Sequence, residues 1–79
     1  MTEMELFVNY DNRMFTVHIK DTCTVADLKK EIKKFVDKRY DELHVTYKQY
    51  TLQDEKLLSS YNMKSGESVM IYIVVHGGA

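Results

Sequence analysis

The fold is decided by residues 4–20, which have the sequence MELFVNYDNRMFTVHIK. Both halves of this stretch alternate between apolar and polar side chains, which is the pattern of a half-buried β-strand. The residues that share the apolar faces are Met4, Leu6 and Val8 in the first half and Phe15, Val17 and Ile19 in the second. Between the halves, Asp11, Asn12 and Arg13 supply side chains that suit a tight turn. The stretch therefore predicts a β-hairpin.

After Asp21 the apolar residues recur every three or four positions, which predicts an α-helix. Its apolar positions are Val25, Leu28, Ile32 and Val36, with Phe35 beside them. Thr24 can cap the N-terminus of this helix, and Asp27 lies where an acidic side chain complements the helix dipole. Lys38 and Arg39 bring to the expected last turn the positive charge that the dipole favours there. We therefore expect one helix that begins at Val25 and ends near Arg39.

The rest of the chain predicts further strands that are separated by turns. Residues 43–48 alternate like a third strand, and a very short strand is expected around Leu52. A single helical turn is expected within residues 57–63, before a turn at residues 65–67. Residues 69–75 are all apolar or aromatic, which predicts a central strand. The order of elements predicts a single α+β domain, in which one helix packs across a mixed sheet of four to five strands.

The composition argues against several classes of function. A chain of 79 residues with a net charge of −1 forms one small core, and it lacks the positive charge of a dedicated nucleic-acid binder. Its single cysteine, Cys23, cannot form an internal disulfide, which favours a reducing compartment. His18, His44 and His76 are too widely spaced to suggest a metal site, and no catalytic triad or phosphate-binding loop is evident. We expect no enzymatic activity, no cofactor, no direct nucleic-acid binding and no membrane insertion.

Several short motifs, taken in order, make nearly the whole chain resemble ubiquitin. The motifs are Met4-Glu5-Leu6-Phe7-Val8, Thr24-Val25, Leu28-Lys29, Ile32, Leu52-Gln53-Asp54, Leu58-Ser59, Tyr61-Asn62 and the terminal Gly77-Gly78. The resemblance implies the β-grasp fold, with a domain at residues 1–75 and a flexible tail at residues 76–79. It also implies a largely buried ion pair between Lys29 and Asp54, and a hydrogen bond of Tyr61 within its own loop. The core that it implies consists of Met4, Leu6, Val8, Phe15, Val17, Ile19, Val25, Leu28, Ile32, Val45, Leu52, Leu58, Met63, Val69 and Ile71.

The resemblance also indicates where the receptor-binding surface of ubiquitin would lie. That surface is an aliphatic patch made by a leucine, an isoleucine and a valine. These positions hold Asp11 (or a neighbour in the shortened turn), Thr46 and Tyr72 here. Each lost apolar contact costs about 1–3 kcal/mol of binding free energy, so we expect binding to ubiquitin receptors to be lost. An exposed apolar cluster of different shape can still mark a protein interface. Strand alternation predicts that Phe7, Met70 and Tyr72 point outward, with His44 and Thr46 nearby. The candidate partner-binding face consists of His44, Thr46, Met70 and Tyr72.

The C-terminal residues suggest proteolytic processing. Gly77 and Gly78 have no Cβ, so they can enter the narrow channel of a processing protease or an activating enzyme. Ala79 blocks the carboxylate of Gly78 until it is removed. Ubiquitin precursors that are fused to a small-subunit ribosomal protein commonly continue from Gly-Gly into Ala, and this chain is similar to the ubiquitin-like part of such a fusion. We therefore expect the N-terminal moiety of a ribosomal-protein fusion precursor, without the ubiquitin signalling patch.

Three other interpretations of the chain remain open. It could be a conjugable modifier, attached through Gly78 after Ala79 is removed, or a non-conjugated interaction domain. The glycines could also form a plain flexible linker. The expected partners are proteins, namely the fused ribosomal protein and a processing protease or activating enzyme. We expect a monomer in the cytoplasm and nucleus, associated with the ribosome if the fusion is retained.

Overall fold

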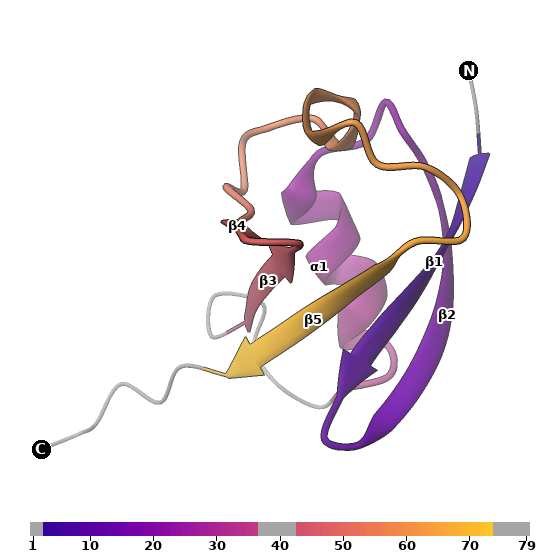
Figure 1. The fold of residues 1–79 in the computed structure, drawn as a ribbon, viewed down its shortest axis with the longest axis vertical. Helices are drawn as coiled ribbons and strands as arrows, with labels where there is room; N and C mark the ends of the chain where they lie inside the picture. Colours follow the sequence, from indigo (N-terminus) through magenta and orange to yellow (C-terminus); the bar gives the residue numbers. More distant parts are fainter. Residues whose placement is uncertain (1–2, 37–42, 74–79) are drawn as a thin grey trace, which may run out of the picture.

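The computed structural model describes residues 3–36 and 43–73, which form one helix packed across a five-stranded mixed sheet (Figure 1). The elements are β1 (Glu3–Tyr10), β2 (Arg13–Lys20), α1 (Val25–Lys33), β3 (Leu43–Tyr47), β4 (Tyr50–Thr51), the 3₁₀ turn η2 (Leu58–Tyr61) and β5 (Ser68–Ile73). The strand order in the sheet is β2-β1-β5-β3-β4. Only the β1–β5 pair is parallel, which makes the sheet mixed. This is the predicted α+β architecture.

The N-terminal hairpin is closed by a turn of two residues. Asp11 and Asn12 both have positive φ angles, of 53° and 59°, as a type I′ turn requires. Arg13, which was expected in the turn, instead begins β2 and pairs with Tyr10. The register continues from this pair to Glu3 opposite Lys20, so the apolar faces of β1 and β2 coincide. The hairpin therefore presents one continuous apolar surface to the helix.

The last strand, β5, is the middle strand of the sheet, as its apolar sequence predicts. It pairs in parallel with β1, where Val69 lies opposite Val8, and in antiparallel fashion with β3, where Ile71 lies opposite Val45. The strand was expected over residues 69–75. It begins one residue earlier, and residues 74 and 75 lie outside the described residues.

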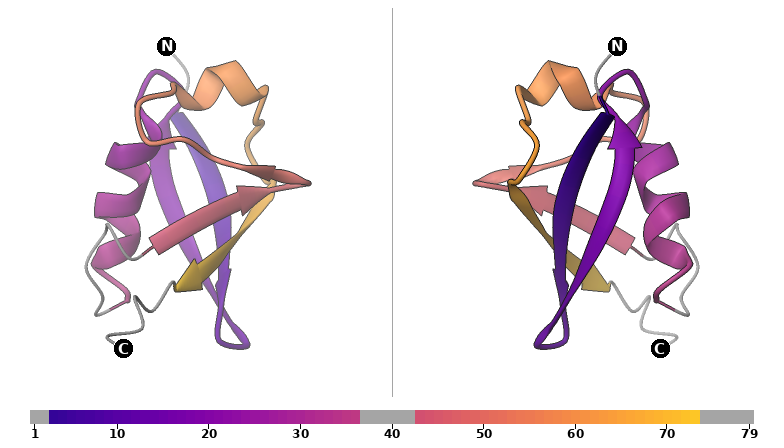
Figure 2. Two further views of the ribbon diagram at one scale, coloured as in Figure 1. Left: turned by 90° about the vertical axis from the view of Figure 1, so that its left-hand side faces the viewer. Right: turned by 90° about the vertical axis from the view of Figure 1, so that its right-hand side faces the viewer.

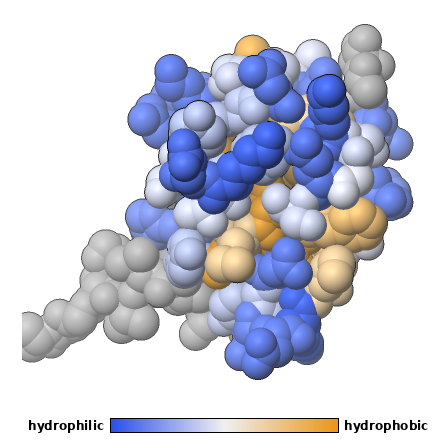
Figure 3. All heavy atoms as spheres, viewed as in Figure 1, coloured by the Kyte–Doolittle hydropathy of each residue, from blue (hydrophilic) through white to orange (hydrophobic). Residues whose placement is uncertain are grey.

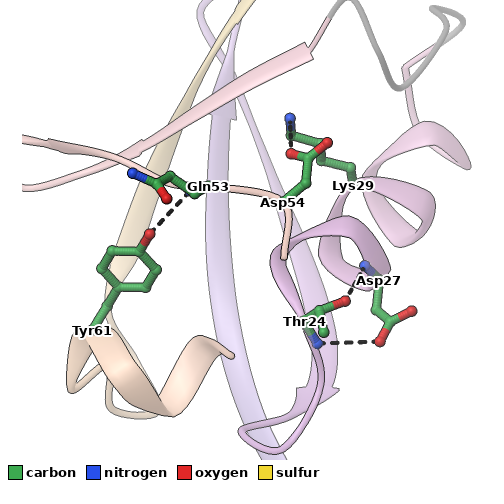
Figure 4. Close-up of polar contacts among 6 residues, drawn as sticks. All are labelled: Thr24, Asp27, Lys29, Gln53, Asp54 and Tyr61. Atoms are coloured by element: carbon green, nitrogen blue, oxygen red, sulfur yellow. Dashed lines mark hydrogen bonds and ion pairs between the residues drawn. The ribbon is translucent and has the colours of Figure 1, made fainter. Parts of the chain in front are cut away.

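The helix begins where the sequence predicts and ends earlier. Thr24 Oγ1 accepts a hydrogen bond of 3.2 Å from the Asp27 N–H, and the Thr24 N–H donates one of 3.1 Å to Asp27 Oδ2 (Figure 4). This reciprocal pair is a capping box. The helix ends at Lys33, although the buried Val36 still donates its N–H to the Ile32 carbonyl. The predicted end of the helix near Lys38 and Arg39 is therefore wrong, because α1 ends at Lys33. Lys38 and Arg39 themselves lie outside the described residues.

We expect Thr24→Ala to lower the free energy of unfolding by about 1 kcal/mol, because it leaves one N–H of the first helical turn without its acceptor. Thr22→Ala is the matched control, since Thr22 is exposed and lies outside the capping box. Urea unfolding followed by circular dichroism measures both variants. Equal losses in the two variants would contradict a capping role for Thr24.

The core lies between the helix and one face of the sheet. It consists of Met4, Leu6, Val8, Val17, Ile19, Val25, Leu28, Ile32, Val36, Leu43, Val45, Tyr47, Leu52, Leu58, Met63, Val69 and Ile71. Phe15 was predicted in this core and is only half-buried, because it lies at the edge of the sheet and stacks on the exposed Phe35, with ring centroids 5.2 Å apart. Leu43 and Tyr47, which were not in the predicted core, are both buried.

Candidate functional site

The candidate partner-binding face lies on the outer side of β3 and β5. His44 lies opposite Tyr72 and Thr46 lies opposite Met70 in the antiparallel register, so the four side chains form two adjacent cross-strand pairs. They alternate with the buried residues of the same strands, which places them on the side away from the helix. Thr46 Oγ1 donates a hydrogen bond of 3.3 Å to the Met70 carbonyl, which holds the threonine against β5.

The two large side chains of this face are accessible to a partner. Met70 is 49% exposed and Tyr72 is 51% exposed. Their cross-strand partners, Thr46 and His44, are half-buried. Phe7, on the adjacent β1, is half-buried and lies beside Ser68 of β5 on the same face. Figure 3 shows apolar patches on this side of the molecule with hydrophilic side chains around them.

The rim of this face contains polar residues that the sequence did not single out. A shallow hollow of about 230 Å³ borders Met70 and Tyr72, and Asn9, Lys48 and Ser68 line it. Asn9 Nδ2 donates a hydrogen bond of 3.4 Å to the Val69 carbonyl, and Lys48 Nζ lies 5.2 Å from the centroid of the Tyr47 ring. Asn9 could have been found from the alternation of β1. Lys48 could not, because its position depends on the positive φ of the β3–β4 turn.

The chemistry of this face differs from an aliphatic patch. Thr46 presents a hydroxyl group and Tyr72 a phenol at two of the positions where the resemblance to ubiquitin implies aliphatic side chains. Asp11, which was expected at or beside the third such position, is exposed in the hairpin turn. Tyrosine and methionine are both enriched in protein–protein interfaces, since they combine large apolar area with polar or polarisable atoms. The arrangement is suited to binding a protein.

A second predicted contact, between Lys29 and Asp54, anchors the helix to the segment after β4. Lys29 Nζ and Asp54 Oδ1 are 2.5 Å apart (Figure 4). The Asp54 carbonyl also accepts a hydrogen bond of 3.1 Å from the Ala26 N–H. The side chain of Lys29 is buried, whereas that of Asp54 is 46% exposed, so the pair is buried at its lysine end only.

Tyr61 makes a polar contact of the kind that was expected. Its Oη accepts a hydrogen bond of 3.0 Å from the Gln53 N–H, which closes the loop between β4 and η2 (Figure 4). The contact joins two segments that are eight residues apart in the chain. It therefore fixes the loop that carries Asp54 and presents that residue to the helix.

The remaining candidates do not gather into a reactive site. Cys23 is half-buried at the entry to α1, and no group of histidine, cysteine and carboxylate side chains suited to a metal ion occurs among residues 3–36 and 43–73. Within the same part of the chain, no helix has the length and apolar character needed to cross a bilayer. The predicted processing residues Gly77, Gly78 and Ala79 lie outside the described residues.

In the described residues, one helix packs on a mixed five-stranded sheet that has one exposed face, and no catalytic group is assembled. This arrangement defines a β-grasp domain of the ubiquitin-like class. The profile of the ubiquitin family matches residues 6–75, and the chain belongs to this family. Ubiquitin-like domains are generally non-catalytic and commonly bind protein partners.

Solved structures show the same fold. The ubiquitin-like domain of an Arabidopsis thaliana protein has a TM-score of 0.90 at 20% identity, covering 100% of this chain and 85% of that one. The ubiquitin-like domain of Plasmodium falciparum Dsk2 has a TM-score of 0.84 at 25% identity, covering 89% of this chain and 96% of that one. No curated protein matches the chain at a significant level.

Proposed function

We propose that this chain is a ubiquitin-like interaction domain that binds a protein partner through the outer face of β3 and β5. One observation carries the proposal: Met70 and Tyr72, each about half exposed, lie next to each other on this face with His44 and Thr46 paired beside them. Aromatic side chains at the centre of such a face are typical hot spots of binding. The likeness to the ubiquitin-like domain of Dsk2 also favours a domain that works within a longer protein.

The partner differs from the receptors that recognise ubiquitin. A receptor pocket shaped for aliphatic side chains would have to accommodate the phenol of Tyr72 and desolvate the hydroxyl of Thr46. Receptor affinities in the micromolar range correspond to about 8 kcal/mol of binding free energy. Two mismatched contacts at about 1–3 kcal/mol each would weaken that binding by about 30-fold or more. A partner that recognises this face therefore has a site that accepts an aromatic ring and a thioether.

We expect Tyr72→Ala to weaken binding to the native partner by tenfold or more, since an anchor residue contributes about 2 kcal/mol or more. Tyr50→Ala is the matched control, because Tyr50 is 52% exposed on β4 and lies off the proposed face. Affinity capture from a native lysate, followed by quantitative mass spectrometry, compares the two variants with the parent domain. A Tyr72→Ala variant that retains every partner would refute binding through this face.

A second candidate function rests on the tail of a ubiquitin-family domain, which has the sequence Gly77-Gly78-Ala79. In this proposal the chain is the N-terminal moiety of a ribosomal-protein fusion precursor that is cleaved after Gly78 or retained. It would then be found in the cytoplasm and nucleus, and on the ribosome if it is retained. The related alternative is a modifier that is joined through the Gly78 carboxylate to lysine side chains of target proteins.

The tail proposals are tested by the gene and by the protein. A gene that continues past Ala79 into a basic segment with a four-cysteine zinc pattern supports the fusion, and a stop codon refutes it. For conjugation, a tagged chain that ends at Gly78 is expected to form adducts of higher mass, and Gly78→Ala is expected to abolish them. A lysate without such adducts would rule out the modifier.

A further inference from the structure

Two methionine side chains lie on the outer side of the sheet, on either side of Asn9. Met14 of β2 lies opposite Asn9 of β1, and Asn9 lies opposite Met70 of β5 in the parallel register. Buried residues such as Val17 and Val69 occupy the alternate positions of these strands, so both methionines point away from the core. Figure 2 shows α1 on the other side of the sheet and the β1–β2 turn extending past the end of the helix. The helix therefore covers neither methionine.

The four methionines of the described residues form one exposed pair and one buried pair. Met14 is 61% exposed and Met70 is 49% exposed, whereas Met4 and Met63 are 2% and 6% exposed and belong to the core. The thioether of methionine is readily oxidised to a sulfoxide. A small oxidant dissolved in water reaches the exposed pair directly, and it reaches the core pair only when the fold opens.

Met70 separates two hollows on the outer side of the sheet. The larger, of about 570 Å³, lies beside the hairpin turn and is lined by both Met14 and Met70. The smaller, of about 230 Å³, is lined by Met70 and Tyr72. Met70 and Asn9 are the two residues that line both hollows. A change in the polarity of Met70 therefore alters the whole outer surface between the hairpin turn and β3.

A sulfoxide at Met70 is compatible with the folded domain and unfavourable in a complex. Because the side chain is half exposed, the sulfoxide oxygen stays in contact with water and no core residue has to move. A partner that covers the face removes this water, and burying a polar oxygen without a hydrogen-bond donor is costly. Oxidation of Met70 therefore weakens binding without unfolding the chain.

We propose that Met14 and Met70 form a peroxide-reactive methionine site, and that oxidation of Met70 releases the partner from the outer face of β3 and β5. The release rests on the function proposed above. In the reaction, a lone pair of the thioether sulfur attacks one oxygen of hydrogen peroxide and the O–O bond breaks. The sulfur loses two electrons, and the departing hydroxide takes the proton of the transferred oxygen to form water. Methionine sulfoxide reductases restore the thioether.

The first test maps oxidation of the whole chain, with Cys23→Ser in every sample so that no thiol competes for peroxide. Peptide mass spectrometry follows the gain of one oxygen atom at each methionine during exposure to hydrogen peroxide. We expect Met14 and Met70 to react at least about tenfold faster than Met4 and Met63. The urea midpoint should stay unchanged when only the exposed pair is oxidised. Equal rates at the four positions, or a lowered midpoint, would overturn the site.

The second test measures release, with each variant compared with itself before and after peroxide. The probe is the set of proteins that the parent domain captures from a native lysate and that Tyr72→Ala loses. Oxidation of the parent should lower their capture by about tenfold, and methionine sulfoxide reductases should restore it. Met70→Leu should abolish this response, since leucine has no sulfur. Met14→Leu is the matched control and should still respond to peroxide.

The outcomes distinguish the release from the binding function on which it rests. If the oxidised chain still captures the proteins that depend on Tyr72, or if Met70→Leu responds to peroxide as the parent does, the release is wrong and the binding face stands. If Tyr72→Ala retains every partner, the binding function fails and the release fails with it. The relative oxidation rates then still decide whether Met14 and Met70 form the reactive site.

Discussion

Leu58→Ala is expected to lower the free energy of unfolding by about 2–5 kcal/mol, which is the usual range for truncating a fully buried leucine. Leu58 begins η2 and is completely buried, so removing its side chain leaves a cavity beneath the loop that follows β4. The substitution leaves intact the backbone bond of 2.9 Å from the Leu58 N–H to the Cys23 carbonyl. The loss therefore reports side-chain packing alone.

The preceding residue provides a matched control. Leu57 is 46% exposed, so Leu57→Ala removes the same atoms from a position that water already reaches, and it should cost less than about 1 kcal/mol. Urea unfolding measures both variants, and the midpoint should fall for Leu58→Ala while the slope stays constant. Because single domains have about 5–15 kcal/mol of stability, and small ones lie at the low end, the Leu58 variant should be partly unfolded at 37 °C. Equal losses for the two variants would contradict this assignment of the core.

The regular elements could be predicted because their signals are local. The alternation of β1 and β2 and the cap residues Thr24 and Asp27 fixed their positions without any knowledge of distant contacts. The end of the helix could not be located in this way, since no glycine or proline occurs in the residues just after Lys33, where it would end the helix. Leu43 and Tyr47 share the buried face of β3 with Val45, so alternation could have added both to the predicted core.

Sites that depend on pairing between distant segments were less predictable. Alternation predicted that Thr46 and Tyr72 face outward, but their closeness depends on the register between β3 and β5. The stack of Phe15 on Phe35 depends on where the helix packs against the hairpin, which no local pattern specifies. The resemblance to ubiquitin supplied the Lys29–Asp54 pair, and the structure adds that the two ends of this pair differ in exposure.

That difference in exposure predicts unequal effects of removing either partner. Asp54→Ala leaves the Lys29 ammonium group buried without its carboxylate, and a buried charged donor without a partner costs about 1–3 kcal/mol. Lys29→Met keeps the apolar stem and removes the charge, while the half-exposed Asp54 returns to water. We therefore expect Lys29→Met to change the free energy of unfolding by less than about 1 kcal/mol.

The double variant Lys29→Met/Asp54→Ala should be close in stability to Lys29→Met, because no buried charge is left to desolvate. Glu55→Ala serves as the control for losing an acidic side chain in the same loop, since Glu55 is exposed and forms no ion pair with the described residues. Thermal and urea unfolding measure the free energy of unfolding of the four variants and of the parent chain. If Asp54→Ala costs no more than Glu55→Ala, or if Lys29→Met costs more than Asp54→Ala, the pair does not act through the burial of its lysine. If Asp54→Ala costs more than Lys29→Met, as expected, Asp54 stabilises the fold by neutralising the Lys29 ammonium group. The packing of the helix has already buried that group.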